Sequence, residues 1–145
     1  AFDKASMMQM GAKKMKEKII IVEDDPFSKD FYKIIFGRAG YDPIVLEDGN
    51  LVLQNLAQNK ISVIIMDINL KNTYLDNVKI DGIKLSRTIK EDIRFCNIPV
   101  ILVSAYSDSF KEIDLLGDSL ADDFITKPII DFNLFLKKIN SFILA

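Results

Sequence analysis

Short apolar runs alternate with segments of helical periodicity from Lys18 to the end of the chain. Each run is apolar at consecutive positions and is mostly β-branched, which is typical of strands that are covered on both faces of a parallel sheet. The strands predicted in this way are 19–22, 44–46, 63–66, 100–103 and 124–126.

The segments between these runs predict helices. They begin at Pro26, near Gly49, near Gly82, near Ser109 and at Asp131. Pro26 suits a first helical position and Gly40 a helix end, while Asp131 is a good N-cap. Five strands that alternate with five helices predict an α/β fold, a doubly wound parallel sheet with helices on both faces.

Helical spacing also predicts which side chains face the core. In the first helix we expect Phe27, Phe31, Ile34 and Ile35 to face inward, with Tyr32 and Phe36 off that face. In the later helices the expected inward residues are Leu53, Leu56 and Ala57, then Leu85 and Ile89, then Phe132, Phe135, Leu136, Ile139 and Ile143.

Composition narrows the possible functions. A length of 145 residues favours one domain, and a hydrophobic fraction of 49% is ample for its core. The net charge of −2 gives no electrostatic case for binding nucleic acid or an anionic membrane. Without a long apolar run or a signal-peptide pattern, a cytoplasmic location is expected.

Residues 1–17 carry no strand signal and are interpreted as a tail, a linker or an expression remnant, or as a helix from an upstream domain.

The chain contains no histidine and a single cysteine, Cys96. Without a histidine, this chain by itself cannot carry out Ser-His or Cys-His catalysis or bind zinc through histidine. Cys96 is expected to be an ordinary free thiol.

Polar side chains follow four of the predicted strands. Glu23, Asp24 and Asp25 follow the first strand, and Asp67 follows the third. Ser104 and the pair Lys127-Pro128 follow the fourth and fifth. Carboxylates bind hard cations such as Mg²⁺ and can act as nucleophiles, while a lysine neutralises phosphoryl charge. Together these groups indicate phosphoryl transfer onto a carboxylate.

These motifs resemble the receiver domain of two-component response regulators, the CheY-like family. The resemblance covers residues 18–145 and rests on five motifs, each at or just after a strand end except the fourth, which precedes a helix. They are Glu23-Asp24, Asp67-Ile68-Asn69, Val103-Ser104-Ala105, Asp81-Gly82 and Phe124-Ile125-Thr126-Lys127-Pro128. The resemblance implies a flavodoxin-like (βα)5 three-layer sandwich with sheet order 2-1-3-4-5.

The resemblance also implies the roles of the site residues. Asp67 is the expected phosphoacceptor. Asp24, Asp67 and the backbone carbonyl of Asn69 are expected to bind Mg²⁺ or Mn²⁺, with Glu23 acting through a water. Lys127 is expected to pair first with Asp67 and then with the phosphoryl group.

Further roles follow from the same resemblance. Ser104 and Phe124 are the expected switch residues, and Asn69 and Tyr106 stand at positions that influence hydrolysis of the acyl phosphate. The Lys127–Pro128 bond is expected to be cis. Asp25 is interpreted as a solvated loop acid outside the metal pair.

The implied partner is a sensor histidine kinase or a histidine phosphotransfer protein, which supplies the phosphohistidine that this chain lacks. The face formed by the fourth helix, fifth strand and fifth helix is the expected surface for a homodimer or an output domain. Leu134, opposite the core stripe of the last helix, is either an apolar contact there or a singly exposed leucine.

Two alternative functions remain at this point. One is a metal-dependent phosphatase with an aspartyl nucleophile, although Asn69 stands where such enzymes carry a second acid. The other is a pseudo-receiver that binds partners without phosphorylation. A further departure is the loop at 71–80, which makes the Asp67–Asp81 spacing longer than the family norm. It is either a tolerated surface insertion or a loop beside the acceptor site that shapes kinase docking or shields the phosphoryl group.

Overall fold

The structure is a computed structural model that describes residues 15–105 and 109–143. The main strands are β1 (Lys18–Val22), β2 (Asp42–Leu46), β3 (Val63–Asp67), β6 (Val100–Ser104) and β7 (Asp123–Thr126). The helices are α2 (Pro26–Arg38), α3 (Gly49–Gln58), α4 (Gly82–Glu91), α5 (Ser109–Ser119) and α6 (Phe132–Ile143).

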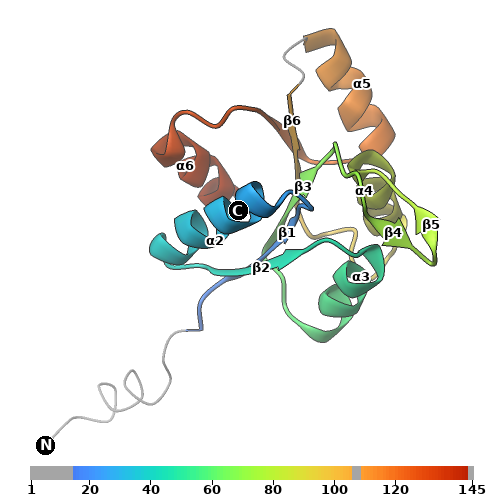
Figure 1. Cartoon of the computed structure of the whole chain (residues 1–145), viewed down its shortest axis with the longest axis horizontal. Coiled ribbons are helices and arrows are strands. Elements are labelled where there is room, and N and C mark those ends of the chain that lie inside the picture. Colours follow the sequence, from blue (N-terminus) through green and yellow to red (C-terminus); the bar gives the residue numbers. More distant parts are fainter. Residues whose placement is uncertain (1–14, 106–108, 144–145) are drawn as a thin grey trace, which may run out of the picture.

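The five main strands form one parallel sheet in the order β2-β1-β3-β6-β7. This is the predicted order 2-1-3-4-5 counted over the main strands, so the doubly wound α/β fold is confirmed. Figure 1 shows α2 and α6 on one side of the sheet and α3, α4 and α5 on the other. Parallel strands share a carboxyl edge, and all four of the predicted polar strand ends lie there.

Alternation along each strand explains why the apolar runs are continuous. Ile20 and Val22 of β1 pack into the cluster under α3 and α4, whereas Ile19 and Ile21 pack into the cluster under α2 and α6. All four side chains are fully buried. A strand between two helical layers has no solvent-facing side, so both sets of alternate positions are apolar.

The predicted inward face of α2 is wrong in part: Phe31 packs against the core as expected and Ile35 is half-buried, but the other two expected residues are exposed. Phe27 is 86% exposed and Ile34 is 54% exposed, whereas Tyr32 and Phe36 are buried in the core. Both sets recur at helical spacing, so α2 carries two apolar stripes. The aromatic rings of α6 select between them, because Phe36 and Phe135 lie 5.6 Å apart between ring centroids.

The other helix faces agree more closely with the prediction. Leu56 of α3 and both Leu85 and Ile89 of α4 are buried, but Ala57 is exposed and Val52 takes its place in the core. In α6, Phe135 and Ile139 are buried, while Phe132 is 44% exposed at the first turn. The carboxylate of Asp131 accepts a hydrogen bond from the Leu134 amide, as expected of an N-cap.

The loop at 71–80 forms a small antiparallel hairpin, β4 (Tyr74–Leu75) and β5 (Val78–Lys79). Asp76 and Asn77 between the strands have φ angles of 50° and 65°. Two successive left-handed residues are the signature of the tight turn that joins hairpin strands, and Asp and Asn tolerate that backbone better than most residues. Among the described residues, no helix has the length and apolar character that crossing a membrane requires.

Replacing core and surface aromatics of α2 tests the corrected face. Phe36→Ala should lower the free energy of unfolding by about 3–5 kcal/mol, because it removes a fully buried ring. Phe27→Ala, the matched control, should change it by no more than about 0.5 kcal/mol. Urea denaturation of both variants measures the difference, and equal effects would restore the original assignment of the face.

Candidate functional site

A cleft at the carboxyl edge of the sheet gathers most of the predicted site residues. Its lining includes Glu23, Asp24, Asp67, Asn69 and Lys127. Glu23 and Asp24 follow β1, Asp67 ends β3, and Lys127 follows β7. Because β1 and β3 are hydrogen-bonded neighbours, residues that are more than 40 positions apart in the chain become adjacent at this edge.

Asp67 lies at the centre of the cleft and is only 4% exposed. The Lys127 ammonium lies 2.7 Å from Asp67 Oδ2, and the backbone amide of Asn69 donates to Oδ1 at 2.8 Å. Burial by itself would raise the pKa of Asp67, but neighbouring Glu23, the Lys127 cation and the Asn69 amide together lower it. Asp67 is therefore held as a carboxylate.

Glu23 is the buried member of the acidic pair, at 1% exposed. Its Oε1 accepts a hydrogen bond from the Asp25 amide at 2.9 Å. Its buried Oε2 has no hydrogen-bond partner among the described residues and lies 3.8 Å from the Lys127 ammonium. Burial and the nearby Asp67 carboxylate raise the pKa of Glu23 to about 8. One lysine is thus shared between two buried acids.

Asp24 and Asp25 have different surroundings from Glu23. Asp25 is exposed and caps α2, because its Oδ2 accepts a hydrogen bond from the Ser28 amide at 2.9 Å. That hydrogen bond lowers the pKa of Asp25. Asp24 is half-buried, and its Oδ2 accepts from the backbone amides of Lys71 and Asn72 at 2.7 and 2.8 Å.

The switch candidates lie beside the cleft. Ser104, at the end of β6, is fully buried, and its carbonyl accepts a hydrogen bond from the Lys127 amide at 2.7 Å. Phe124 is 8% exposed and packs in the cluster under α3 and α4. The Lys127–Pro128 peptide bond is cis, as expected from the sequence. Tyr106 lies outside the described residues.

Gly82 has a role that the sequence motif alone did not explain. A Cβ at this position would lie 2.0 Å from the Asp67 carbonyl oxygen and 2.8 Å from the Ile68 Cα. The preceding Asp81 caps α4 through the Lys84 amide. The Asp81-Gly82 pair therefore starts α4 directly against the backbone of the acceptor residue.

Sequence reasoning left open a role for the 71–80 loop beside the acceptor site but did not anticipate its contact with Asp24. Lys71 and Asn72 line it, and both donate backbone hydrogen bonds to Asp24. The unusual spacing between Asp67 and Asp81 was the available signal. Spacing alone does not show on which side of the cleft an insertion folds.

The fold is a doubly wound α/β domain, and its site places buried acids and one lysine at the carboxyl edge of the sheet. Comparisons with known proteins identify the family that has this combination of fold and site. Residues 19–140 match the family described as "Response regulator receiver domain". The chain therefore belongs to the response regulator receiver family. It is a receiver domain of the kind found in two-component signalling proteins.

Two relatives illustrate this membership, and one solved structure shares the fold. The chain is 35% identical over 113 residues to the transcriptional regulatory protein BaeR of Escherichia coli, covering 77% of this chain and 42% of that protein. It is 32% identical over 139 residues to histidine kinase P4 of Formosa agariphila, covering 94% of this chain and 10% of that protein.

The structural relative is the receiver domain of a sensor histidine kinase from Pseudomonas aeruginosa. It superposes with a TM-score of 0.74 at 19% identity, over 90% of this chain and 99% of that one, and its active-site cleft is described as coordinating a magnesium ion. The chain spans less than half the length of the curated relatives it matches.

Gly82→Ala tests the close approach of α4 to Asp67. Because the added methyl group would overlap backbone atoms, the free energy of unfolding should fall by roughly 1–3 kcal/mol or more. Gly37→Ala, in α2 with open space around the added methyl group, should instead be stabilising by about 0.5–1 kcal/mol. Chemical denaturation compares the two, and a Gly82→Ala protein as stable as the parent would contradict the steric argument.

Glu23→Gln tests the cost of the buried acid in metal-free protein. A carboxyl whose pKa is raised on folding destabilises the folded state increasingly as pH rises from 4.5 to about 8. The substitution should therefore stabilise the protein by roughly 1–3 kcal/mol at pH 8 and by much less near pH 5.

Thermal unfolding in a chelating buffer at both pH values measures the Glu23→Gln effect. Glu91→Gln is the control, because Glu91 pairs with Arg87 at the surface and should contribute little at either pH. A gain that is independent of pH would show that burial of the charge is not the cause.

Proposed function

We propose that Asp67 accepts a phosphoryl group from the phosphohistidine of a sensor histidine kinase or a histidine phosphotransfer protein. The observation that carries this proposal is the buried Asp67 carboxylate held 2.7 Å from the Lys127 ammonium. Family membership supports it, because receivers are the acceptor modules of two-component systems. We further propose a cytoplasmic site of action for the unit that begins at Lys18, with residues 1–17 preceding it as a tail or linker.

The residues of the cleft fit a divalent metal ion. Asp24, Asp67 and the Asn69 carbonyl offer oxygen ligands, which hard cations such as Mg²⁺ or Mn²⁺ prefer. The unpartnered, buried Oε2 of Glu23 is consistent with an outer position reached through a water. Among the described residues, no three Asp, Glu, His or Cys side chains are placed so that together they could hold a metal ion. An Mg²⁺ site of this kind needs only one or two carboxylates, since waters and phosphate complete it.

The metal, when bound, would offset the charge on the transferring phosphoryl group. An Asp67 oxygen forms the new bond to phosphorus, while the phosphorus–nitrogen bond to the partner's imidazole breaks and that nitrogen keeps the electron pair. The Lys127 ammonium then lies beside the new phosphoryl oxygens, so its charge passes from the carboxylate to the product. The Ser104 hydroxyl is proposed to donate a hydrogen bond to one of those oxygens.

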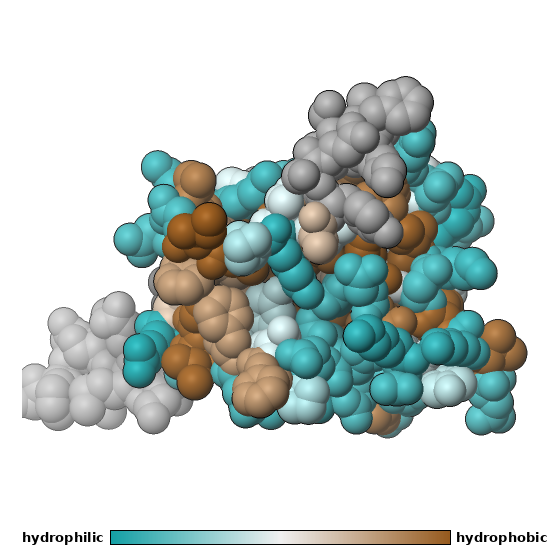
Figure 2. Space-filling model, turned by 45° about the horizontal axis from the view of Figure 1, so that its top comes forward, coloured by the Kyte–Doolittle hydropathy of each residue, from teal (hydrophilic) through white to brown (hydrophobic). Residues whose placement is uncertain are grey.

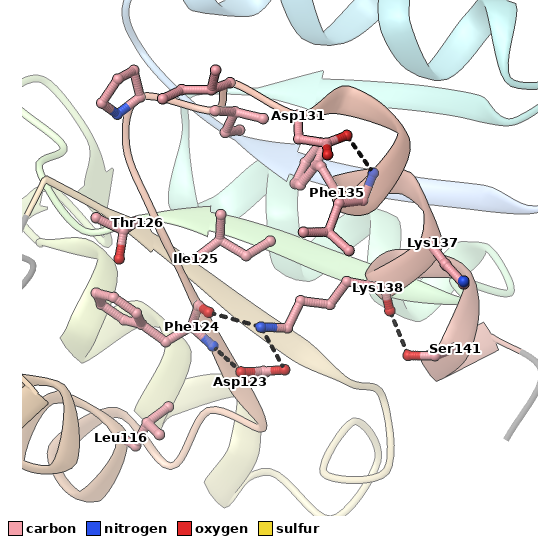
Figure 3. A pocket seen from close by; sticks show the side chains of 14 residues that line it. Leu116, Asp123, Phe124, Ile125, Thr126, Asp131, Phe135, Lys137, Lys138 and Ser141 are labelled. Atoms are coloured by element: carbon pink, nitrogen blue, oxygen red, sulfur yellow. Dashed lines mark hydrogen bonds and ion pairs between the residues drawn. The ribbon is translucent and has the colours of Figure 1, made fainter.

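Output is proposed to follow from Ser104 and Phe124. The new charge favours the conformation in which Ser104 turns toward the phosphoryl group and Phe124 moves with it. Phosphorylation would therefore shift the population between two conformations that present different surfaces to a partner. Figure 3 shows that Phe124 and Ile125 project to opposite sides of β7. A movement of β7 would therefore be felt in both helical layers.

The proposed output surface is a groove formed by α5, β7 and α6. Its lining includes Leu116, Leu134 and Lys137. Lys138 of α6 also lines the groove, and its ammonium lies 3.3 Å from the Phe124 carbonyl oxygen and 3.3 Å from the Asp123 carboxylate (Figure 3). A homodimer or an output domain would bind here, and Leu134 is 64% exposed in position for such a contact.

The phosphodonor is proposed to dock on the other side of the cleft. Phe27 of α2 is 86% exposed, and the Phe132 ring, which is 44% exposed, lies 5.4 Å from the Phe31 ring between centroids. Figure 2 looks onto the carboxyl edge and shows hydrophobic side chains gathered at its left, over α2 and α6. An apolar surface beside the acceptor suits a helical partner that presents its histidine.

The two alternative functions lack support in the site. The position two residues after Asp67 is Asn69, whose amide binds the acceptor carboxylate, so a phosphatase would lack its second acid. A pseudo-receiver has no need of the Asp67–Lys127 pair that the structure contains. Both alternatives nevertheless predict different outcomes in the same experiment.

Incubation with acetyl phosphate and Mg²⁺ tests the proposal. The intact mass should increase by one phosphoryl group, and Asp67→Asn should abolish the increase because an amide is not a nucleophile of this kind. Asp25→Asn, the matched control, should still be modified, since Asp25 caps a helix and does not contact Asp67 through any described hydrogen bond. No mass increase would favour the pseudo-receiver, and sustained turnover of a simple phosphate ester would favour the phosphatase.

A further inference from the structure

The 71–80 segment folds back onto the cleft rather than away from it. Three donors at its start converge on one oxygen, Oδ2 of Asp24. The amides of Lys71 and Asn72 donate at 2.7 and 2.8 Å, and the Thr73 hydroxyl lies at 3.4 Å. These residues come from the loop after β3, whereas Asp24 follows β1, so the contact joins two different strand ends.

The segment is anchored at both ends. Thr73 is fully buried, and its carbonyl accepts a hydrogen bond from the Ile80 amide at 2.9 Å, which closes the base of the hairpin. At the far end, the Asn50 side chain of α3 exchanges two hydrogen bonds with Asp76, at 2.8 and 2.9 Å. A hairpin this short is marginal by itself, so these contacts are what hold it in place.

The hairpin also packs closely against α3. A Cβ at Gly49 would lie 2.7 Å from the Tyr74 carbonyl oxygen, so only glycine permits this approach. Three separate contacts, at Asp24, Asn50 and Gly49, therefore fix the position of the segment. A tolerated surface insertion would need none of them.

The hydrogen bonds to Asp24 offset the repulsion between neighbouring carboxylates in the cleft. Asp24 shares the cleft with the Asp67 carboxylate. Like charges about 4 Å apart repel by roughly 4 kcal/mol at an effective dielectric of 20, so a second carboxylate at this edge needs donors that offset the repulsion. Amide and hydroxyl donors carry partial positive charge, so they offset the repulsion and hold the carboxylate at the cleft.

We propose that residues 71–73 form a clasp that positions Asp24 for the metal ion, with Thr73 as its positioning side chain. This inference rests on the proposed function, since it assumes that Asp24 is a metal ligand. Within the described part of the chain, every hydrogen bond to Asp24 ends on Oδ2, which leaves Oδ1 for the cation. Groups that orient a ligand from behind commonly strengthen metal binding in this way.

Isothermal titration of Mg²⁺ into Thr73→Val, Thr73→Ser and the parent protein tests the clasp. Thr73→Val keeps the shape and removes the hydroxyl, and it should raise the dissociation constant by about tenfold, the low end for such a group because the contact is 3.4 Å long. Thr73→Ser keeps the hydroxyl and should restore binding to within about twofold. Thr88→Val is the matched control, because the Thr88 hydroxyl bonds only the Lys84 carbonyl of its own helix among the described contacts.

Asn50→Ala provides a second test that leaves the cleft untouched. It removes the far anchor of the hairpin from an exposed helical position, and alanine there is compatible with α3. The dissociation constant for Mg²⁺ should again rise, by about twofold to fivefold. Amide hydrogen exchange at Lys71 and Asn72 should accelerate in the same variant, as their hold on Asp24 loosens.

The outcomes separate the clasp from the function it serves. Unchanged Mg²⁺ affinity in both Thr73→Val and Asn50→Ala would overturn the clasp, even if Asp67 is phosphorylated normally. Tight Mg²⁺ binding that depends on Thr73, without phosphorylation of Asp67, would support the clasp and overturn the proposed function. If Thr73→Ser lost as much Mg²⁺ affinity as Thr73→Val, the effect would come from packing and not from the hydroxyl. That result would also overturn the clasp.

Discussion

The ion pair between Lys127 and Asp67 is the interaction on which the rest of the site depends. Asp67 is almost completely buried at the end of a central strand, and a lone charge in such a place would be costly. One ammonium at 2.7 Å offsets that cost, and it also lies 3.8 Å from the equally buried Glu23. One lysine therefore serves two buried acids, and the one farther from it, Glu23, has its pKa raised to about 8.

The backbone around Asp67 is constrained as tightly as its side chain. The Asn69 amide binds one carboxylate oxygen, and Gly82 starts α4 within contact of the Asp67 carbonyl. The cleft is therefore bounded by main-chain atoms on the β3 side and by Lys127 on the β7 side.

The hairpin gives this receiver a feature of its own. Its first residues donate hydrogen bonds to Asp24, and its turn is hydrogen-bonded to α3. The hairpin therefore connects the acidic end of β1 to α3. Two of the three donors to Asp24 are main-chain amides, which any sequence supplies, and only the Thr73 hydroxyl comes from a side chain. The loop therefore lines the cleft without a sequence motif that would have indicated it.

The sequence by itself determined the alternating strands and helices, the doubly wound class and the acids, serine and lysine at the strand ends. These follow from local patterns, because a strand buried on both faces must be apolar throughout and its polar residues must lie at its end. Tertiary structure decided between the two apolar stripes of α2, since only packing against α6 distinguishes Tyr32 and Phe36 from Phe27 and Ile34. It also decided that the hairpin turns toward Asp24 and that Gly82 lies against Asp67, because contacts between segments far apart in the chain leave no periodic signal in it.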